Sequence, residues 1–203
     1  MLTAAVASKA GHQRAHTGLR ERLRAATAQA HQRLDAQLGA LDLQSRPGYR
    51  QFLAANAAAL LPLERALEEA GVREVLSDWD QRTRSRAIRS DLARLGGTTR
   101  PLPEPAPLDF GAMLGTLYVL EGSRLGAAVL VKIVAQSSDT LVATATAYLR
   151  HGAGARLWPG FLARLDELSI TSHDEVRAID GARAAFDLFA QATARVRAGE
   201  IAA

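Results

Sequence analysis

The segment FGAMLGTLYVLEGSRLGAAVLVKIVA, residues 110–135, constrains the fold more than any other part of the chain. Its length and apolar content predict one long helix, yet its interior contains Gly111, Gly115, Gly122 and Gly126. Each interior glycine costs about 1 kcal/mol relative to alanine, so the four cost about 3 to 4 kcal/mol of helix propensity. At about 100° per residue, the four lie within about 60° of one another. The helix therefore has a stripe without side chains, against which something bulky or flat must pack.

Two interpretations of the glycine stripe are open. In the first, a second helix packs closely against the stripe, because small residues allow two backbones to approach. In the second, a planar cofactor lies across the backbone. Tyr118 and Val119 flank the stripe on either side and would contact such a cofactor.

The first predicted helix, residues 19–38, carries a single histidine, His31. A lone histidine beside an apolar face is more often a structural residue than a ligand. Here Arg24 precedes it by seven residues and Asp35 follows it by four, so the three share roughly one face of the helix. An iron-binding imidazole commonly donates its other N–H to a carboxylate, and an arginine can bind an acidic group of a cofactor. The neighbours therefore favour His31 as a ligand, with Asp35 supporting it.

Two segments resemble the heme oxygenase family, especially the bacterial biliverdin-producing type associated with phytochromes. YVLEGSRLGAAVL resembles the distal helix of that family, and LRAATAQAHQRLDA resembles its proximal helix. The resemblance covers roughly residues 19–196 and implies an all-α, heme-oxygenase-like fold. It also implies that His31 is the proximal iron ligand and that Arg24 contacts a heme propionate.

The reaction of the family implies roles for further residues. Heme is both cofactor and substrate, and the products are biliverdin, CO and free iron. Gly122 and Gly126 would provide a distal wall without side chains, and Ser123 is the candidate for holding the water network that delivers protons. The resemblance therefore implies an enzyme that uses heme b, O2 and electrons from a ferredoxin-type donor, with a bacteriophytochrome as a conceivable acceptor of biliverdin.

The last predicted helix, residues 172–197, opens with Ser172 and Glu175, a pattern typical of a capping box. The stretch LSITSHDEVRAIDGARAAF resembles the C-terminal part of heme oxygenases. Aromatic residues there close over the heme edge, which implies that role for Phe186 and Phe189. An ordinary core position is nearly as well supported for both.

The chain departs from the animal enzymes in its distal helix. Those enzymes carry an aspartate where this chain has Ser123, and a second consecutive glycine where it has Ala127. The proton path is therefore expected to differ.

The propionate contacts depart from the animal enzymes as well. Their two basic propionate partners correspond to Trp158 and Leu162, which leaves Arg24 as the recognised anchor. Arg20 and Arg156 are candidates to replace the two missing basic partners, although neither lies at a corresponding position in the sequence. Which meso carbon is cleaved is open.

Three other functions compete with the enzyme. A non-catalytic heme- or biliverdin-binding protein would have the same helices. A helical interaction protein would use its glycines for packing only. A nucleic-acid binder is a distant alternative, because aromatic residues make up 5% of the chain and no basic run alternates with them.

Composition adds further limits. The chain has no cysteine, which excludes disulfides, iron–sulfur clusters and a thiolate-ligated heme. The net charge of +4 comes from arginine, since Lys9 and Lys132 are the two lysines. No apolar run reaches the about 20 residues that a bilayer crossing needs, so we expect a soluble, cytoplasmic protein.

The remaining segments predict further helices. Residues 49–70 form one such helix, which Pro62 should kink or split. Its acidic residues Glu64, Glu68 and Glu69 predict a solvated face. Residues 77–95 carry Arg82, Arg84, Arg86, Arg89 and Arg94, which indicate a salt-bridged surface or a landing site for an acidic electron donor.

The proline-rich residues 96–107 predict a loop, and residues 141–149 and 161–168 predict short helices. No convincing strand pattern is present. The sequence therefore predicts a single all-α domain of seven or eight helices over residues 19–198, with tails at 1–18 and 199–203.

Overall fold

The computed structural model describes residues 3–201, and the side chains from residue 18 onward. Every regular element in this part is an α-helix, as the sequence predicts. The longer helices are α1 (Thr3–Gly39), α2 (Arg46–Glu69), α5 (Ser85–Arg94), α6 (Phe110–Val134), α8 (Leu157–Glu167) and α9 (Ser172–Arg197). Three segments of four or five residues complete the set: α3 (Val72–Val75), α4 (Trp79–Arg82) and α7 (Thr140–Thr144).

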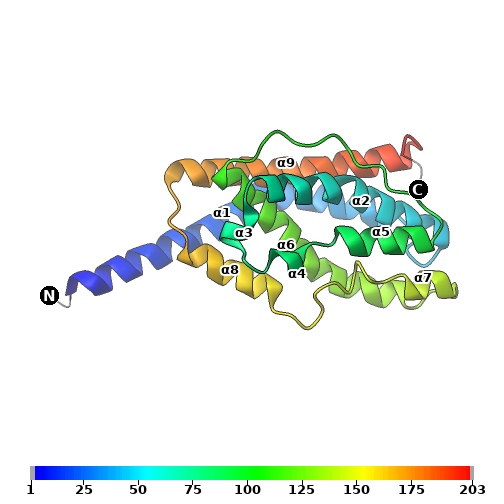
Figure 1. Cartoon of the computed structure of the whole chain (residues 1–203), viewed down its shortest axis with the longest axis horizontal. Helices are drawn as coiled ribbons and strands as arrows, with labels where there is room; N and C mark the ends of the chain where they lie inside the picture. The colour runs from blue at the N-terminus through cyan, green and yellow to red at the C-terminus, as the bar shows by residue number, and fades with distance from the viewer. Residues whose placement is uncertain (1–2, 202–203) are drawn as a thin grey trace.

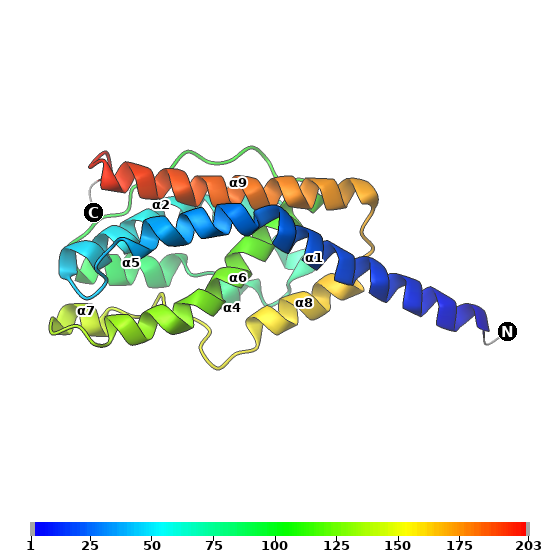
Figure 2. The same cartoon turned by 180° about the vertical axis from the view of Figure 1, so that it is seen from behind.

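Helix α9 is the element around which the others pack. It contacts α6 most extensively and also runs along α1 and α2. Helix α6 crosses the molecule obliquely, and α5 lies on the side away from α1, as the two opposite views show (Figures 1 and 2). The buried apolar side chains form one connected core that includes residues of all the longer helices.

Helix α2 continues through Pro62 without interruption, so the predicted split of this helix does not occur. Its N-terminus begins earlier than predicted because Ser45 caps it, accepting a hydrogen bond from Gly48 N at 3.2 Å, and Pro47 occupies the first turn. Proline suits the first turn because the N–H it lacks would have no partner there.

The predicted solvated face of α2 is wrong for one residue, Glu64, which is 3% exposed. Its carboxylate accepts hydrogen bonds from the backbone N–H groups of Arg84 and Ser85 and from the hydroxyls of Thr83 and Ser85. These contacts satisfy the free N–H groups at the start of α5. The predicted salt-bridged surface is likewise wrong for two arginines of this region, Arg82 and Arg84, each 3% exposed.

The first half of the glycine stripe packs against α9. A Cβ at Gly115 would overlap the carbonyl oxygen of Ala178, and one at Gly111 would overlap the backbone of Asp174. Gly181 of α9 makes the same kind of contact with the backbone of Ala112. This half of α6 thus follows the helix-packing interpretation.

The capping box of α9 lies one residue earlier than predicted. Thr171 accepts from Asp174 N at 3.2 Å, and the Asp174 carboxylate accepts from Thr171 N at 3.0 Å. The predicted tail at residues 1–18 falls mainly on residues whose side chains lie outside the described part of the structure, so this prediction stays open. None of the described helices combines the length and the apolar character that a membrane crossing requires.

Candidate heme site

A cavity of about 670 Å³ lies between α1 and α6. Within the described residues these two helices make almost no direct contact, and side chains of α2, α8 and α9 complete the wall. Most of the lining is apolar, with Phe52, Leu34, Leu38, Leu130 and Leu149 among it. Its volume and character are those of a site for a sizeable organic ligand.

All ten residues that the sequence singled out line this one cavity. Five come from α1 or flank the glycines: Arg24, His31, Asp35, Tyr118 and Val119. The other five are Gly122, Ser123, Gly126, Phe186 and Phe189. The fold therefore brings together residues that are up to 165 positions apart in the chain, from Arg24 to Phe189.

The imidazole of His31 is held at one of its two nitrogens. Its Nδ1 lies 2.9 Å from Oδ2 of Asp35, one helical turn later. The ring of Phe186 meets the imidazole edge-on, with the ring centres 5.8 Å apart. The contact with Asp35 leaves Nε2 as the nitrogen that can bind a metal.

The second half of the glycine stripe is bare. A Cβ at Gly126 would meet no other atom within 4 Å, and one at Gly122 would only touch the ring of Trp158 at 3.6 Å. Among the described residues, the ring of Trp158 on α8 is the nearest neighbour of this half, in contrast to the close backbone packing at Gly111 and Gly115. The backbone of α6 is therefore open to the cavity where the cofactor interpretation requires it.

The proton of the Ser123 hydroxyl is already used in a hydrogen bond. Its Oγ donates to the carbonyl oxygen of Leu120 at 2.7 Å and accepts from Nη1 of Arg84 at 3.0 Å. A hydroxyl has one proton to donate and two lone pairs to accept. In this arrangement Ser123 can accept one more hydrogen bond from the cavity.

Two cations of α1 line the cavity one turn apart, Arg20 and Arg24. The phenol of Tyr118 lies near them, and burial raises its pKa while the two arginines oppose that rise. Arg156, the other substitute considered from the sequence, does not line the cavity. Arg20 is thus the second cation placed to meet an acidic group of a ligand.

The polar residues of the cavity wall that were not expected from the sequence include Asn56, Arg84 and Tyr148. The Tyr148 hydroxyl donates to Oδ1 of Asn56 at 3.2 Å, and burial raises the pKa of this phenol, so it stays protonated at neutral pH. The sequence offered no signal for this pair, because 92 positions separate the two residues. The surrounding arginines and aspartates gave Arg84 the pattern of a surface residue.

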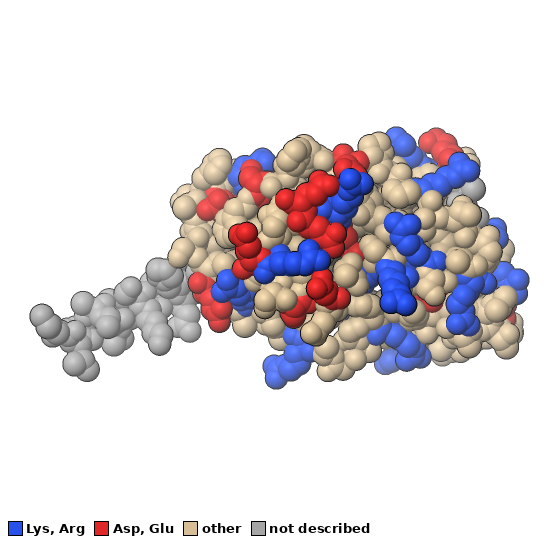
Figure 3. All heavy atoms as spheres, in the orientation of Figure 1, with Lys and Arg blue, Asp and Glu red and all other residues tan. Residues whose placement is uncertain are grey.

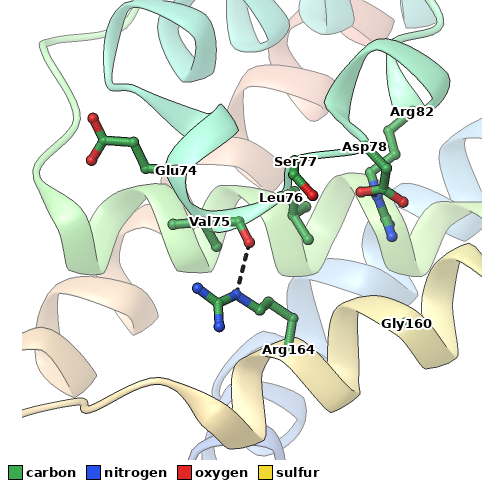
Figure 4. A pocket seen from close by; sticks show the side chains of 8 residues that line it. All are labelled: Glu74, Val75, Leu76, Ser77, Asp78, Arg82, Gly160 and Arg164. Carbon is green, nitrogen blue, oxygen red and sulfur yellow. Dashed lines mark hydrogen bonds and ion pairs between the residues drawn. The ribbon is translucent and has the colours of Figure 1, made fainter.

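A second pocket, of about 330 Å³, lies between the short helices α3 and α4 and helix α8 (Figure 4). Its two arginines already have partners, since Arg164 Nε donates to the carbonyl oxygen of Val75 at 3.0 Å and Arg82 Nε donates to Asp78 at 2.6 Å. It lacks the apolar lining and the accessible ligand nitrogen of the larger cavity. The larger cavity is therefore the candidate functional site.

An all-helical fold that presents a histidine and a glycine-rich helix segment to one apolar cavity has the features of a class of protein that binds a flat prosthetic group.

The heme oxygenase family model matches residues 104–195. Heme oxygenase PigA of Pseudomonas aeruginosa is 32% identical over 177 residues, covering 83% of this chain and 88% of that protein. A heme oxygenase of Xanthomonas campestris pv. campestris is 30% identical over 141 residues, covering 70% of this chain and 86% of its own length.

The NO- and CO-bound heme oxygenase of Neisseria meningitidis has the same fold, with a TM-score of 0.70 and 24% identity over 88% of this chain and 91% of that one. The chain therefore belongs to the heme oxygenase family. It is an enzyme of a family that uses heme, as the resemblance in its α1 and α6 segments implied.

Proposed function

We propose that this protein cleaves heme to biliverdin, CO and iron, and that heme is both its substrate and its cofactor. The observation that carries the proposal is the pairing of His31 with the bare Gly122 and Gly126 backbone in one apolar cavity. A histidine alone would fit many helical proteins. Together with a facing wall whose backbone carries no side chain at Gly122 and Gly126, it would fit a heme site that must admit O2.

The residues of the cavity suit heme as a ligand. His31 would hold the iron through Nε2, with Asp35 fixing the ring. Arg24 and Arg20 would bind the propionates, and Tyr118, Val119, Phe186 and Phe189 would contact the macrocycle. When bound, heme supplies the O2 and electron-transfer chemistry, and its own ring is the group that is oxidised.

The protein's contribution to that chemistry is to orient the macrocycle and to manage protons. The α6 backbone at Gly122 and Gly126 leaves space beside the macrocycle. Ser123 would anchor a water through the acceptor position that remains free on its Oγ. A proton for the reaction would then come through water and not from the Ser123 hydroxyl itself.

The electrons would come from a ferredoxin-type donor. Three arginines of α5 remain exposed, Arg86, Arg89 and Arg94, and positive side chains gather over this end of the molecule (Figure 3). They would attract an acidic partner. The likeness of the α6 segment to phytochrome-associated enzymes supports a cytoplasmic protein that delivers biliverdin to a bacteriophytochrome.

The test is an optical titration with hemin, followed by ascorbate or a ferredoxin system in air. We expect a stoichiometric Soret band in the wild type that His31→Ala loses, and a decay of the wild-type band into broad red absorbance. His173→Ala is the matched control, because this exposed histidine lies at the start of α9, outside the cavity. The absence of a Soret band in the wild type would refute heme binding, whereas a band that stays stable under reduction would indicate a binding protein without turnover.

A further inference from the structure

Arg84 differs from the other inward-facing arginines in its region. Arg82 is paired with two carboxylates, at 2.6 Å from Asp78 and 2.6 Å from Glu121. Arg124 is paired with Glu121 at 2.8 Å. Among the described residues, no carboxylate lies within ion-pair distance of the Arg84 guanidinium, although this side chain is 3% exposed.

The guanidinium of Arg84 is held in place by neutral groups. Nη1 donates to Ser123 Oγ at 3.0 Å and Nη2 donates to the Leu120 carbonyl oxygen at 3.0 Å. The ring of Tyr148 lies 5.4 Å from its central carbon, a favourable cation–π distance. Glu64 accepts a hydrogen bond from the backbone N–H of Arg84 at 2.7 Å, and among the described residues it forms no ion pair with the Arg84 guanidinium.

The buried donor capacity of Arg84 is not fully used. Its Nε is enclosed and has no hydrogen-bond partner in the described structure. The side chain lines the large cavity beside Ser123 and Gly122. Burying a charge without a counter-charge is costly, and an unsatisfied donor adds to that cost. An anion in the adjoining part of the cavity would supply the missing counter-charge and so offset the first of these costs.

We propose that Arg84, with Ser123 beside it, forms a subsite for a small monoanion in the α6 side of the cavity. This inference rests on the proposed heme site, in which the same side of the cavity receives the sixth ligand of the iron. The wall of this chain is therefore cationic where the animal enzymes have an aspartate. It favours anionic ligands such as azide over neutral ligands of similar reach.

The first experiment measures azide and imidazole affinities of the hemin complex by optical titration, at about pH 8 so that imidazole is neutral. Arg84→Gln should weaken azide binding by about 10- to 100-fold, the range expected for losing a charge-assisted contact. Imidazole affinity should change by less than about threefold on the same scale. Arg86→Gln is the matched control, since it removes an equal charge from an exposed position on the same helix.

The outcomes separate a local charge effect from other causes. Equal azide loss in Arg84→Gln and Arg86→Gln, equal loss of azide and imidazole, or unchanged azide affinity in Arg84→Gln would each overturn the proposal. If Arg84→Gln does not take up hemin, the Arg84→Lys variant provides the test. Lysine keeps the charge but lacks the planar guanidinium, so azide affinity should fall several-fold relative to imidazole affinity. An unchanged ratio of azide affinity to imidazole affinity in Arg84→Lys would then overturn the proposal.

The second experiment needs no heme. Trp158 lines the cavity and the chain's other tryptophan, Trp79, is 1% exposed outside it, so quenching of the hemin-free protein reports mainly on the cavity. Quenching by iodide, relative to neutral acrylamide, should be about twofold weaker in Arg84→Gln than in the wild type, because the local anion concentration falls. An identical ratio of iodide quenching to acrylamide quenching in the two proteins would overturn the proposed subsite, even if hemin bound normally. If hemin failed to bind but the ratio fell, the subsite would stand while the proposed function failed.

Discussion

At the scale of single residues, the His31–Asp35 contact decides what the imidazole can do. Both side chains are largely exposed, 61% for His31 and 66% for Asp35, so the pair contributes little to the stability of the fold. Its effect is orientational, because a partner at Nδ1 leaves Nε2 free toward the cavity. The contact therefore matters for ligand binding more than for folding.

Asp35→Ala should weaken hemin binding by about 10-fold, at the low end of the range for residues that support a metal ligand, because the pair is open to solvent. The temperature midpoint of unfolding of the hemin-free protein should hardly change. Both quantities are measured on purified protein, by Soret titration and by circular dichroism.

Asp187→Ala is the control for the lost charge, since Asp187 is exposed on α9 and does not line the cavity. Equal hemin affinity in Asp35→Ala and the wild type would show that Asp35 does not orient His31.

At the scale of elements, helix α6 has two halves with different uses. Gly111 and Gly115 allow α9 to approach its backbone, whereas Gly122 and Gly126 border the cavity. The helix-packing interpretation is thus correct for the first half, while the cofactor interpretation of the second half stays a prediction that the open backbone at Gly122 and Gly126 supports. The boundary lies near Tyr118, whose ring packs on Trp158 with their centres 5.6 Å apart.

Gly115→Ala should destabilise the hemin-free protein by about 1 to 3 kcal/mol, because the added methyl would overlap the backbone of α9 and two long helices would have to shift. Gly126→Ala should leave stability unchanged or raise it by up to about 1 kcal/mol, since its Cβ meets nothing and alanine favours the helix. Urea unfolding of the two variants measures the difference. Similar destabilisation by both would contradict the division of α6.

At the scale of the whole molecule, three aspartates lie at the starts of helices and connect them to distant or neighbouring segments through hydrogen bonds and an ion pair. Asp109 caps α6 by accepting from Ala112 N, and Asp139 caps α7 and pairs with Arg46 at 2.7 Å. Asp174 completes the capping box of α9. The Ala112 N–H, the Arg46 guanidinium and the Thr171 hydroxyl, respectively, are the main causes that hold the pKa of each carboxyl below its ordinary value.

Stability should therefore fall on acidification. A lowered pKa means that the unfolded chain binds protons before the folded chain does, so the contribution is complete above about pH 4 and is lost as pH falls through the folded-state values. Asp91 acts in the opposite sense, because burial raises its pKa. Counting Asp78, whose pKa is lowered first of all by the hydrogen bond from Arg82, four carboxyls with a lowered pKa against one with a raised pKa predict a net loss of stability.

The urea midpoint between about pH 6 and about pH 3 measures this loss. Asp109→Asn should reduce the slope of the midpoint against pH, whereas Asp187→Asn, on the exposed surface, should not. A midpoint that is flat or that rises toward pH 3 would contradict the prediction.

The order of helices could be predicted because it depends on local pattern. Apolar periodicity placed α2, α6 and α9 within a few residues of their observed ends, whereas α1, predicted to start at residue 19, begins at Thr3. Helix α2 is continuous through Pro62, so the predicted split is wrong, while the alternative of a kink stays a prediction. The capping box shifted by one residue, because Ser172 and Thr171 have the same chemistry and only the backbone distinguishes them.

By itself, the sequence determined the all-α class and the ten residues that meet in the cavity, since those depend on spacing along two helices and on family resemblance. Only the tertiary structure decided which half of the glycine stripe packs against α9 and which borders the cavity. It also decided that Glu64, Arg82 and Arg84 are buried, because burial depends on which distant segment covers a side chain. The charge of the cavity wall follows from that burial: Arg84 meets Ser123, 39 positions away, only once α5 and α6 are packed together.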